Sequence, residues 1–184
     1  MNFAYIADIV LFSYDRKTMK LGFLHLNFFE KGYGCKVNCE VFELGKYNRI
    51  INCSFSPNGE SVAFVAKIEK KEILVKDGKK SKAYDKILIF SYSPDWRSLA
   101  FVAEKGWKKV LVSDWKESKE YDEILHFIYS PKGKSLIFLA EKGWKKVLVK
   151  DGKEIGKYDE VFDLEYSPDG EGYAFIAAKD LKEF

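Results

Sequence analysis

Four polar side chains are candidates for binding chemistry: Asn52, His126, Asp163 and Glu165. Each lies in a short, otherwise apolar segment, at positions where equivalent segments of the chain carry Leu, Ile or Ser. Imidazole and carboxylate groups that converge can hold a metal ion or a small polar ligand such as a carbohydrate. The alternative interpretation is a solvated wall that binds nothing.

Asp163 and Glu165 are also the best candidates for an acid and base pair. Residues two positions apart lie on the same face of a strand, and paired carboxylates flanking a bond can catalyse its hydrolysis. No nucleophile–base motif or glycine-rich phosphate loop accompanies them. We therefore expect no catalytic activity, no resident metal and no cofactor.

Two tryptophans occur in identical surroundings, in the segments Lys105–Lys109 and Lys142–Lys146, both of which read Lys-Gly-Trp-Lys-Lys. Exposed Trp107 and Trp144 beside lysines could stack on a base, a sugar or an aromatic side chain. Alternatively, each covers the apolar edge of its own hairpin. Neighbouring acidic residues offset the lysines, which favours a protein partner over a nucleic acid.

The other two tryptophans, Trp96 and Trp115, stand where equivalent turns of the chain have glycine. Losing a turn glycine restricts the backbone, so a compensating contact is expected. Paired exposed tryptophans are common at protein interfaces, and the rival interpretation is that the two rings pack on each other.

The chain contains an internal repeat, which is why similar segments can be compared position by position. Related segments begin at Tyr47, Tyr84, Tyr121 and Tyr158, at intervals of about 37 residues. In each copy a turn of the Ser-Pro-Asp-Gly type follows nine residues later, and then an apolar run such as Ser-Leu-Ala-Phe-Val-Ala. Short Val, Ile, Phe and Tyr runs between Gly, Pro and Asp turns are typical of β-strands. In the third copy we expect strands at 85–92, 98–104, 108–113 and 117–120.

The innermost strand of each copy has two alternating sets of residues. One set is apolar in all copies but one, where Cys53 is the exception and is itself a small hydrophobe. This set predicts packing between neighbouring sheets; it comprises Val10/Phe12/Tyr14, Ile51/Cys53/Phe55, Leu88/Phe90/Tyr92, Leu125/Phe127/Tyr129 and Phe162/Leu164/Tyr166. The other set diverges between copies and contains the four polar candidates. Period-two alternation places it on the opposite face, toward a central channel.

The pattern hydrophobic-x-Tyr/Phe-Ser-Pro-Asp-Gly-x-Ser-hydrophobic-Ala-Phe resembles the TolB-type, WD-repeat-like propeller repeat. The resemblance covers nearly the whole chain and weakens in the first copy, where Asp15-Arg16 replaces Ser-Pro. It implies β-propeller blades and a protein- or ligand-binding role. A resemblance to WG-type repeats is the alternative, although their Trp-Gly pair is absent.

We therefore expect an all-β, five-bladed β-propeller of four-stranded antiparallel blades. It forms a single domain, residues 1–184, with blade units 6–46, 47–83, 84–120, 121–157 and 158–184 plus 1–5. Residues 1–5 align with 153–157, the outermost strand of a unit. This alignment predicts that the N-terminal strand completes the last blade and closes the ring, which would remove exposed sheet edges.

Composition narrows the functional classes. The formal net charge of +3 is too small to indicate a nucleic-acid partner by itself, and abundant Lys and Glu give a thermophile-like composition. No apolar run is long enough to span a bilayer and no signal peptide is evident, so a cytoplasmic location is expected. Together these observations predict a non-catalytic binding or scaffold module that contacts a protein partner or itself; the alternative is small polar ligand or carbohydrate binding at the channel mouth.

Overall fold

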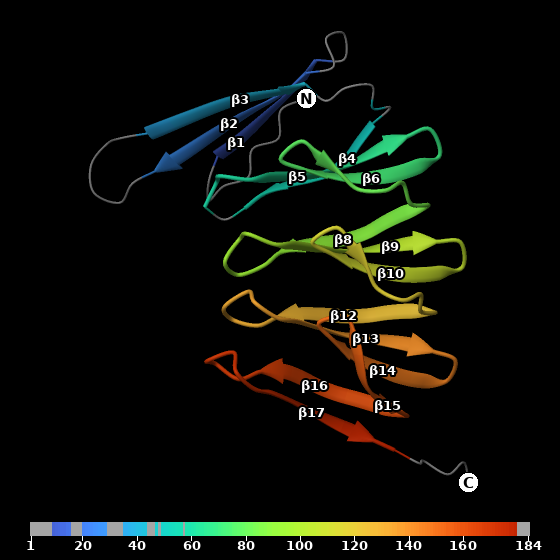
Figure 1. Ribbon diagram of the computed structural model, residues 1–184. Helices are drawn as coiled ribbons and strands as arrows, with labels where there is room; N and C mark the ends of the chain where they lie inside the picture. Colours follow the sequence, from blue (N-terminus) through green and yellow to red (C-terminus); the bar gives the residue numbers. More distant parts are fainter. Residues whose placement is uncertain are drawn as a thin grey trace.

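The computed structural model describes residues 9–15, 20–28, 35–43, 47, 49–56 and 58–179. Within these ranges every regular element is a β-strand (Figure 1). The strands are β1 (Ile9–Asp15), β2 (Lys20–Phe28), β3 (Cys35–Glu43), β4 (Arg49–Phe55), β5 (Val62–Ile68), β6 (Lys71–Lys76), β7 (Lys79–Lys80), β8 (Lys86–Tyr92), β9 (Leu99–Lys105), β10 (Lys108–Ser113), β11 (Lys116–Glu117), β12 (Glu123–Tyr129), β13 (Leu136–Lys142), β14 (Lys145–Lys150), β15 (Lys153–Tyr158), β16 (Glu160–Tyr166) and β17 (Tyr173–Ala178).

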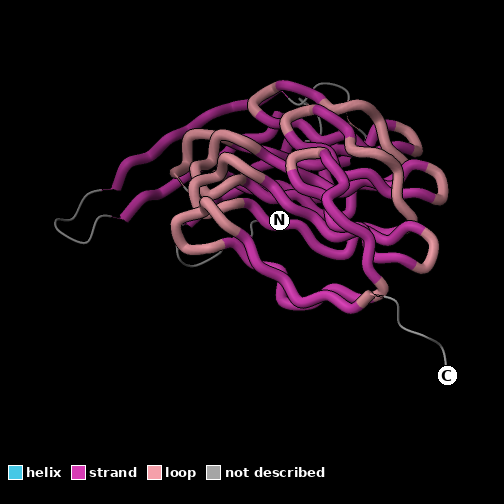
Figure 2. Tube along the Cα trace, turned by 60° about the horizontal axis from the view of Figure 1, so that its bottom comes forward, coloured by secondary structure: helices cyan, strands magenta, loops and turns pink. Residues whose placement is uncertain are grey.

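The strands form consecutive antiparallel sheets in which each strand pairs with the next along the chain. Three sheets have four strands, β4 to β7, β8 to β11 and β12 to β15, while β1 to β3 form a three-stranded sheet and β16 with β17 a two-stranded one. Figure 1 shows the sheets stacked face to face, and the turned view of Figure 2 shows the short turns gathered at the sheet edges. The all-β class and the four-stranded antiparallel sheets predicted from the repeat are confirmed.

Apolar side chains between adjacent sheets form the core. One cluster joins Val65 and Leu74 of the β4–β7 sheet to Phe101 and Val110 of the β8–β11 sheet. The repeated tyrosines extend this packing, because the rings of Tyr84 and Phe101 meet edge to face at 5.7 Å, and Tyr121 and Phe138 do the same. The Tyr84 hydroxyl also donates a 2.8 Å hydrogen bond to Glu117 in β11. The three four-stranded sheets are thus joined to one another through the core and at their outer edges.

A β-bulge in three of the inner strands, β4, β8 and β12, corrects the predicted alternation. The register shifts between Ile50 and Asn52, between Ile87 and Ile89, and between Ile124 and His126. The extra residue turns outward instead of packing, so Ile51, Leu88 and Leu125 are exposed although the alternation placed them between the sheets. Phe162 of β16 is exposed too, beside a register shift of its own. The residues before two of the bulges, Ile87 and Ile124, are buried in their place, and Ile50 before the third is half-buried.

Closure of the ring falls on residues outside the described ranges. The predicted closing strand, residues 1–5, is not among them. In Figure 1 the β1–β3 sheet and the β16–β17 sheet lie at opposite ends of the stack. Within the described residues no sheet joins these two ends, so five-bladed closure stays a prediction.

Candidate interaction surface

Trp107 and Trp144 occupy the tips of two equivalent hairpins. Trp107 lies in the two-residue turn between β9 and β10, which Lys105 and Lys108 close as a strand pair; Trp144 has the same place between β13 and β14. The first turn residue is glycine at a φ of 63° in both hairpins, as the type II′ turn requires. Antiparallel pairing places both tips on one edge of the stack, where Figure 1 shows these turns side by side.

Both indole rings are open to solvent. Trp107 is 98% exposed and Trp144 is 99% exposed, so the interpretation that they cover their hairpins is wrong. In the adjoining β5–β6 hairpin, the same turn position is held by Lys70. The hairpin therefore folds with lysine at its tip, and the two tryptophans are not required by the turn.

An aspartate just before the inner strand of the same sheet fixes each tip and reaches a lysine of the preceding sheet. Asp122 accepts a 2.7 Å hydrogen bond from the backbone N–H of Gly143, next to Trp144, and also pairs with Lys108. Asp85 does the same for Gly106, next to Trp107, and pairs with Lys71 at 2.5 Å. The lysine contact, followed by the backbone N–H, lowers the pKa of each aspartate below its usual range. The tips are therefore held in place before any partner binds.

Ion pairs neutralise most of the lysines around the tips. Besides Lys108 with Asp122, the pairs are Lys105 with Glu120, Lys109 with Glu123, Lys145 with Asp159 and Lys146 with Glu141. A rim in which positive and negative groups alternate offers little net attraction to a polyanion. The surface is thus aromatic and charge-balanced rather than basic.

Trp96 and Trp115 lie on the opposite edge and have left-handed backbone conformations, with φ of 61° and 68°. Their places in equivalent turns are held by glycines, for example Gly133 and Gly152. Trp115 packs against the core between the second and third sheets, and the Lys79 ammonium lies 4.9 Å from its ring centre. Trp96 instead borders a cavity beside Asn52. The two rings thus have different surroundings, and Trp115 has its compensating contact within the chain.

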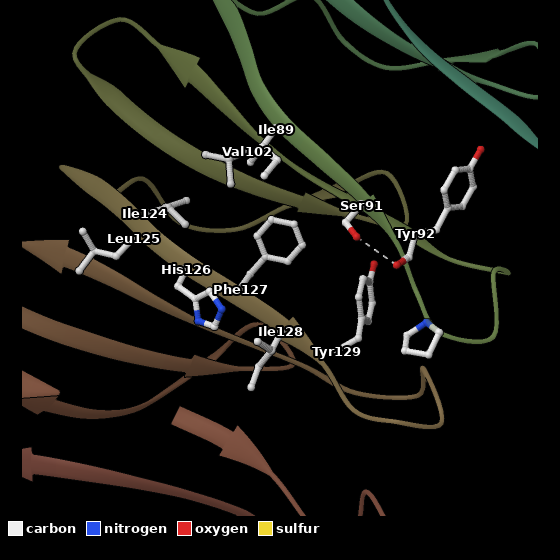
Figure 3. Close-up of a pocket in the computed structure, with 11 residues that line it drawn as sticks. Ile89, Ser91, Tyr92, Val102, Ile124, Leu125, His126, Phe127, Ile128 and Tyr129 are labelled. Carbon is white, nitrogen blue, oxygen red and sulfur yellow. Dashed lines mark hydrogen bonds between the residues drawn. The ribbon is translucent and has the colours of Figure 1, made fainter. Parts of the chain in front are cut away.

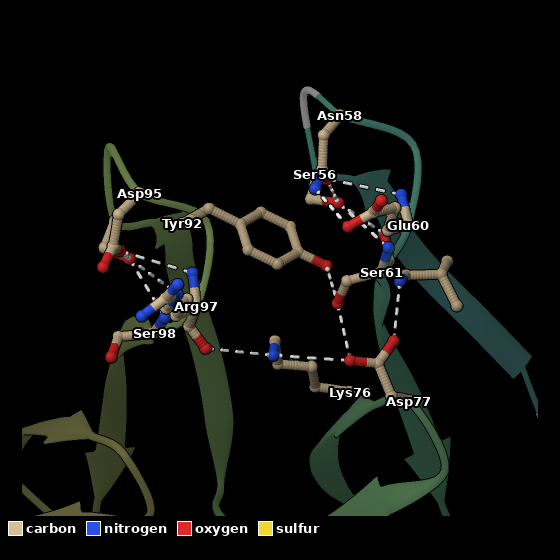
Figure 4. Close-up of polar contacts among 12 residues, drawn as sticks. Ser56, Asn58, Glu60, Ser61, Lys76, Asp77, Tyr92, Asp95, Arg97 and Ser98 are labelled. Carbon is tan, nitrogen blue, oxygen red and sulfur yellow. Dashed lines mark hydrogen bonds and ion pairs between the residues drawn. The ribbon is translucent and has the colours of Figure 1, made fainter.

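Next to Trp115, a hydrogen-bonded link between neighbouring sheets is longer and less complete than its equivalents in the other repeats. In the second sheet Asp77 accepts a 2.6 Å hydrogen bond from Ser61, which lies 3.4 Å from the Tyr92 hydroxyl of the third sheet (Figure 4). The fourth sheet repeats this arrangement with Ser135 and Tyr166 joined at 2.8 Å. In the third sheet, the bond from Ser98 to Asp114 is longer, at 3.1 Å, and among the described residues the buried Tyr129 hydroxyl makes no hydrogen bond of normal geometry, with Ser113 as its polar neighbour.

The four polar candidates lie on inner strands, and all are exposed. His126 borders a cavity of about 450 Å³ between β8 and β12, and Asn52 borders another of about 580 Å³ between β4 and β8. Asp163, at a φ of 51° in the β16 irregularity, and Glu165 belong to the end sheet. The structure therefore distributes the four over three sheets, and the described residues hold no cluster of three or more His, Cys, Asp or Glu suited to a metal.

The cavity beside His126 is mainly apolar. Figure 3 shows Ile89, Leu125 and Ile128 around it, with His126 and Ser91 as polar neighbours. Sequence reasoning missed this apolar lining because the bulge redirects Leu125. The signal was present as two adjacent apolar residues at the start of each inner strand, such as Ile124-Leu125. In the other cavity, burial raises the pKa of the Cys53 thiol to about 11, so Cys53 is protonated and unreactive near neutral pH.

No protein-family model matches the sequence, and no curated protein matches it. Among solved structures the chain is similar to the β-propeller domain of the Trilobed protease from Pyrococcus furiosus, with 16% identity over 87% of this chain and 55% of that chain and a TM-score of 0.47. It is also similar to Hsv2 from Kluyveromyces lactis (13% identity, 96% of this chain, 60% of that chain, TM-score 0.42). A third similar structure is the dihydro-heme d1 dehydrogenase NirN, with 12% identity over 92% of this chain and 40% of that chain and a TM-score of 0.46. The chain spans about half the length of the first solved structures it matches.

The part of the chain that the structure describes contains no helix with the length and apolarity needed to cross a membrane.

Proposed function

We propose that this chain is a non-catalytic, five-bladed propeller-type module that binds a protein partner through Trp107 and Trp144. The observation that carries the proposal is their exposure of 98% and 99% on neighbouring hairpin tips. Covering large aromatic side chains that are in full contact with water lowers the free energy of the complex. Tryptophan is also enriched among the residues that dominate interface energetics.

Preorganisation supports the same surface. Asp85 and Asp122 hold the backbone of the two tips in position, so little conformational entropy is lost when a partner docks. The ion pairs around the tips leave a rim without strong net charge. This balance favours a protein over a nucleic acid.

The test uses the lysine that the chain itself places at the equivalent tip. Wild type and the double variant Trp107→Lys/Trp144→Lys serve as baits in lysate of the source organism, and captured proteins are compared quantitatively. We expect one or a few proteins to be retained by wild type and lost by the double variant, while the melting curves of both baits coincide.

A matched control lies on the other edge of the stack. Trp96→Gly restores the glycine found in equivalent turns, and we expect it to retain the same proteins. Loss of those proteins with Trp96→Gly and their retention by the double variant would move the contact surface to the opposite edge and refute the proposal.

The second candidate function is small-molecule binding in the cavity between β8 and β12. Its volume of about 450 Å³ and its Ile89, Leu125 and Ile128 lining favour an apolar or aromatic ligand over a carbohydrate. A thermal-shift screen of apolar and polar metabolites tests it. Stabilisation by an apolar compound that Leu125→Asp abolishes would support this function, and stabilisation by sugars alone would contradict it.

A further inference from the structure

A cavity of about 250 Å³ opens between the β8–β11 and β12–β15 sheets, on the edge opposite the two tryptophan hairpin tips. Its base is formed by three buried apolar side chains, Leu111, Leu136 and Phe138. Its mouth is bordered by Lys116 and by Gly152 in the turn between β14 and β15. A Cβ atom at Gly152 would meet no atom beyond its chain neighbours within 4 Å, so the space above this glycine is open.

One repeat earlier the chain has the same site, and there a tryptophan fills it. The residues equivalent to the base are Leu74, Leu99 and Phe101, identical in type to those of the cavity. Trp115 stands in the place of Gly152 and packs against the core cluster that contains these three residues. The cavity that remains beside its ring has a volume of only about 40 Å³. The indole of Trp115 therefore shows what kind of group this base accepts.

The two turns have the same backbone conformation, so they differ chiefly in this one side chain. Asp114 and Trp115 have φ of 49° and 68°, and Asp151 and Gly152 have φ of 49° and 78°. In both turns the aspartate accepts a hydrogen bond from a serine of its own sheet, which holds the turn in place. The glycine turn already has the conformation that carries a tryptophan one repeat earlier. The cavity is therefore formed before any ligand enters, which lowers the entropic cost of binding.

Lys116 gives the cavity a contact suited to an aromatic ring. Its equivalent one repeat earlier is Lys79, whose ammonium lies 4.9 Å from the centre of the Trp115 ring. The Lys116 side chain forms no ion pair within the part of the chain that the structure describes. It is therefore free to lie over a ring in the cavity, where its attraction to the π electrons favours an aromatic ligand over an aliphatic one. Ser113, in place of the longer Lys76, leaves additional room.

We propose that the cavity at Gly152 binds a small molecule with an aromatic ring system of indole size, in the position that Trp115 fills one repeat earlier. An apolar cavity of about 150 Å³ is enough to bind benzene, so about 250 Å³ accommodates two fused rings. In the earlier repeat the ring is carried by the turn itself. At Gly152 the glycine backbone takes that place, so a free ring fits better than a tryptophan that a partner's backbone must carry. The site goes beyond the protein contact proposed above and stands whether or not the hairpin tips bind a partner.

The probe is fluoroindole, and its binding to the full chain is followed by fluorine NMR. We expect saturable binding of one molecule per chain with a Kd below about 1 mM. The comparison ligand is N-acetyltryptophan amide, which carries the same kind of ring on a peptide-like group. We expect it to bind at least about tenfold more weakly, because its amide groups meet the backbone of the turn.

Two substitutions at Gly152 test the position of the ligand. Gly152→Trp places in the cavity the side chain that Trp115 provides one repeat earlier, and we expect it to weaken fluoroindole binding at least about tenfold. Gly152→Ala adds the same left-handed strain without a ring and is the matched control. It should change the affinity less than about twofold, and circular dichroism confirms that both variants fold.

Substitutions at two other residues extend the test. Trp115→Gly empties the equivalent site and should add a second bound molecule per chain. Lys116→Met keeps the length of the side chain without its charge and should weaken binding about two- to fivefold, as expected for loss of a cation–π contact at an exposed site.

Four results would overturn the proposal. They are no saturable binding of fluoroindole to wild type, equal binding by Gly152→Trp and Gly152→Ala, no second bound molecule in folded Trp115→Gly, and tighter binding of N-acetyltryptophan amide than of fluoroindole. The last result would assign the cavity to a tryptophan of a partner protein. Should Gly152→Trp fail to fold, the amide NMR signals of Gly152 and Lys116 in wild type decide: shifts on ligand addition support the site, and unchanged signals refute it.

Discussion

At the scale of single residues, the third repeat carries the clearest departure from its neighbours. Trp96 and Trp115 both hold left-handed backbone conformations that the other repeats give to glycine. A side chain in that region is strained by about 1 kcal/mol relative to glycine. Trp115 offsets this through contact with the core and with Lys79. It therefore contributes packing at a position that the backbone alone would assign to glycine.

Two substitutions at Trp115 separate packing from strain. Trp115→Ala loses the packing and keeps a Cβ at a φ of 68°, whereas Trp115→Gly loses the packing but relieves the strain. We expect both to lower the free energy of unfolding, with the alanine variant less stable than the glycine variant by about 1 kcal/mol. Urea denaturation measures the difference, and the reverse order would show that the left-handed conformation is not strained.

The unpartnered hydroxyl of Tyr129 gives a second prediction. Tyr129→Phe removes a buried hydroxyl that makes no hydrogen bond of normal geometry with the described residues, so the variant should be as stable as wild type or slightly more stable. Tyr166→Phe removes the 2.8 Å hydrogen bond to Ser135 and should cost about 1 kcal/mol. Thermal unfolding of the pair checks this, and equal losses would mean that Tyr129 is hydrogen-bonded in solution.

At the scale of elements, much was readable from the sequence. Strands 85–92, 98–104 and 108–113 were predicted within a residue of β8, β9 and β10, because Pro, Asp and Gly mark the turns on either side of β-branched runs. The fourth strand was misplaced and overlong, since β11 is only Lys116–Glu117. The bulges were missed because period-two alternation assumes an unbroken strand, and Leu88 and Leu125 therefore changed face. The exposure of Trp107 was undecidable from the sequence, since a turn residue can fold back or project.

The hairpin tips should loosen in acid. The pKa of Asp122 is lowered in the folded state by Lys108 and by the Gly143 N–H. A lowered folded pKa means that the contact is fully present above the ordinary carboxylate range and is lost as pH falls through the folded pKa. We expect the Gly143 amide to lose protection from hydrogen exchange only when the pH falls below the ordinary range of an aspartate carboxyl. Asp122→Asn should lack this step, and an unchanged step in Asp122→Asn would contradict the assignment.

At the scale of the whole molecule, the stacked sheets explain why function falls on edges and ends. The faces between adjacent sheets are buried by packing. The remaining exposed apolar groups therefore lie on the hairpin tips, on the inner-strand bulges and on the terminal β16–β17 sheet. Those groups include Trp107, Trp144 and Ile176. The repeat fixes the shared scaffold, and differences between copies mark the surfaces available to partners.

The terminal face gives a prediction at this scale. Ile176→Lys should change the free energy of unfolding by less than about 0.5 kcal/mol because the side chain is exposed. The matched change Val102→Lys, at the same position of β9, should unfold the protein because it buries an unpaired charge. Strong destabilisation by Ile176→Lys would show that another segment covers this face in the free protein, as the predicted closed ring requires.

The most direct test of the central claim is the affinity of the captured partner, once purified, measured by calorimetry with wild type and with Trp107→Lys/Trp144→Lys. If the two tryptophans form the centre of the contact, the double variant should bind at least about thirtyfold more weakly, as expected for loss of about 2 kcal/mol or more. An affinity within about twofold of wild type would contradict the account and place the contact elsewhere on the molecule.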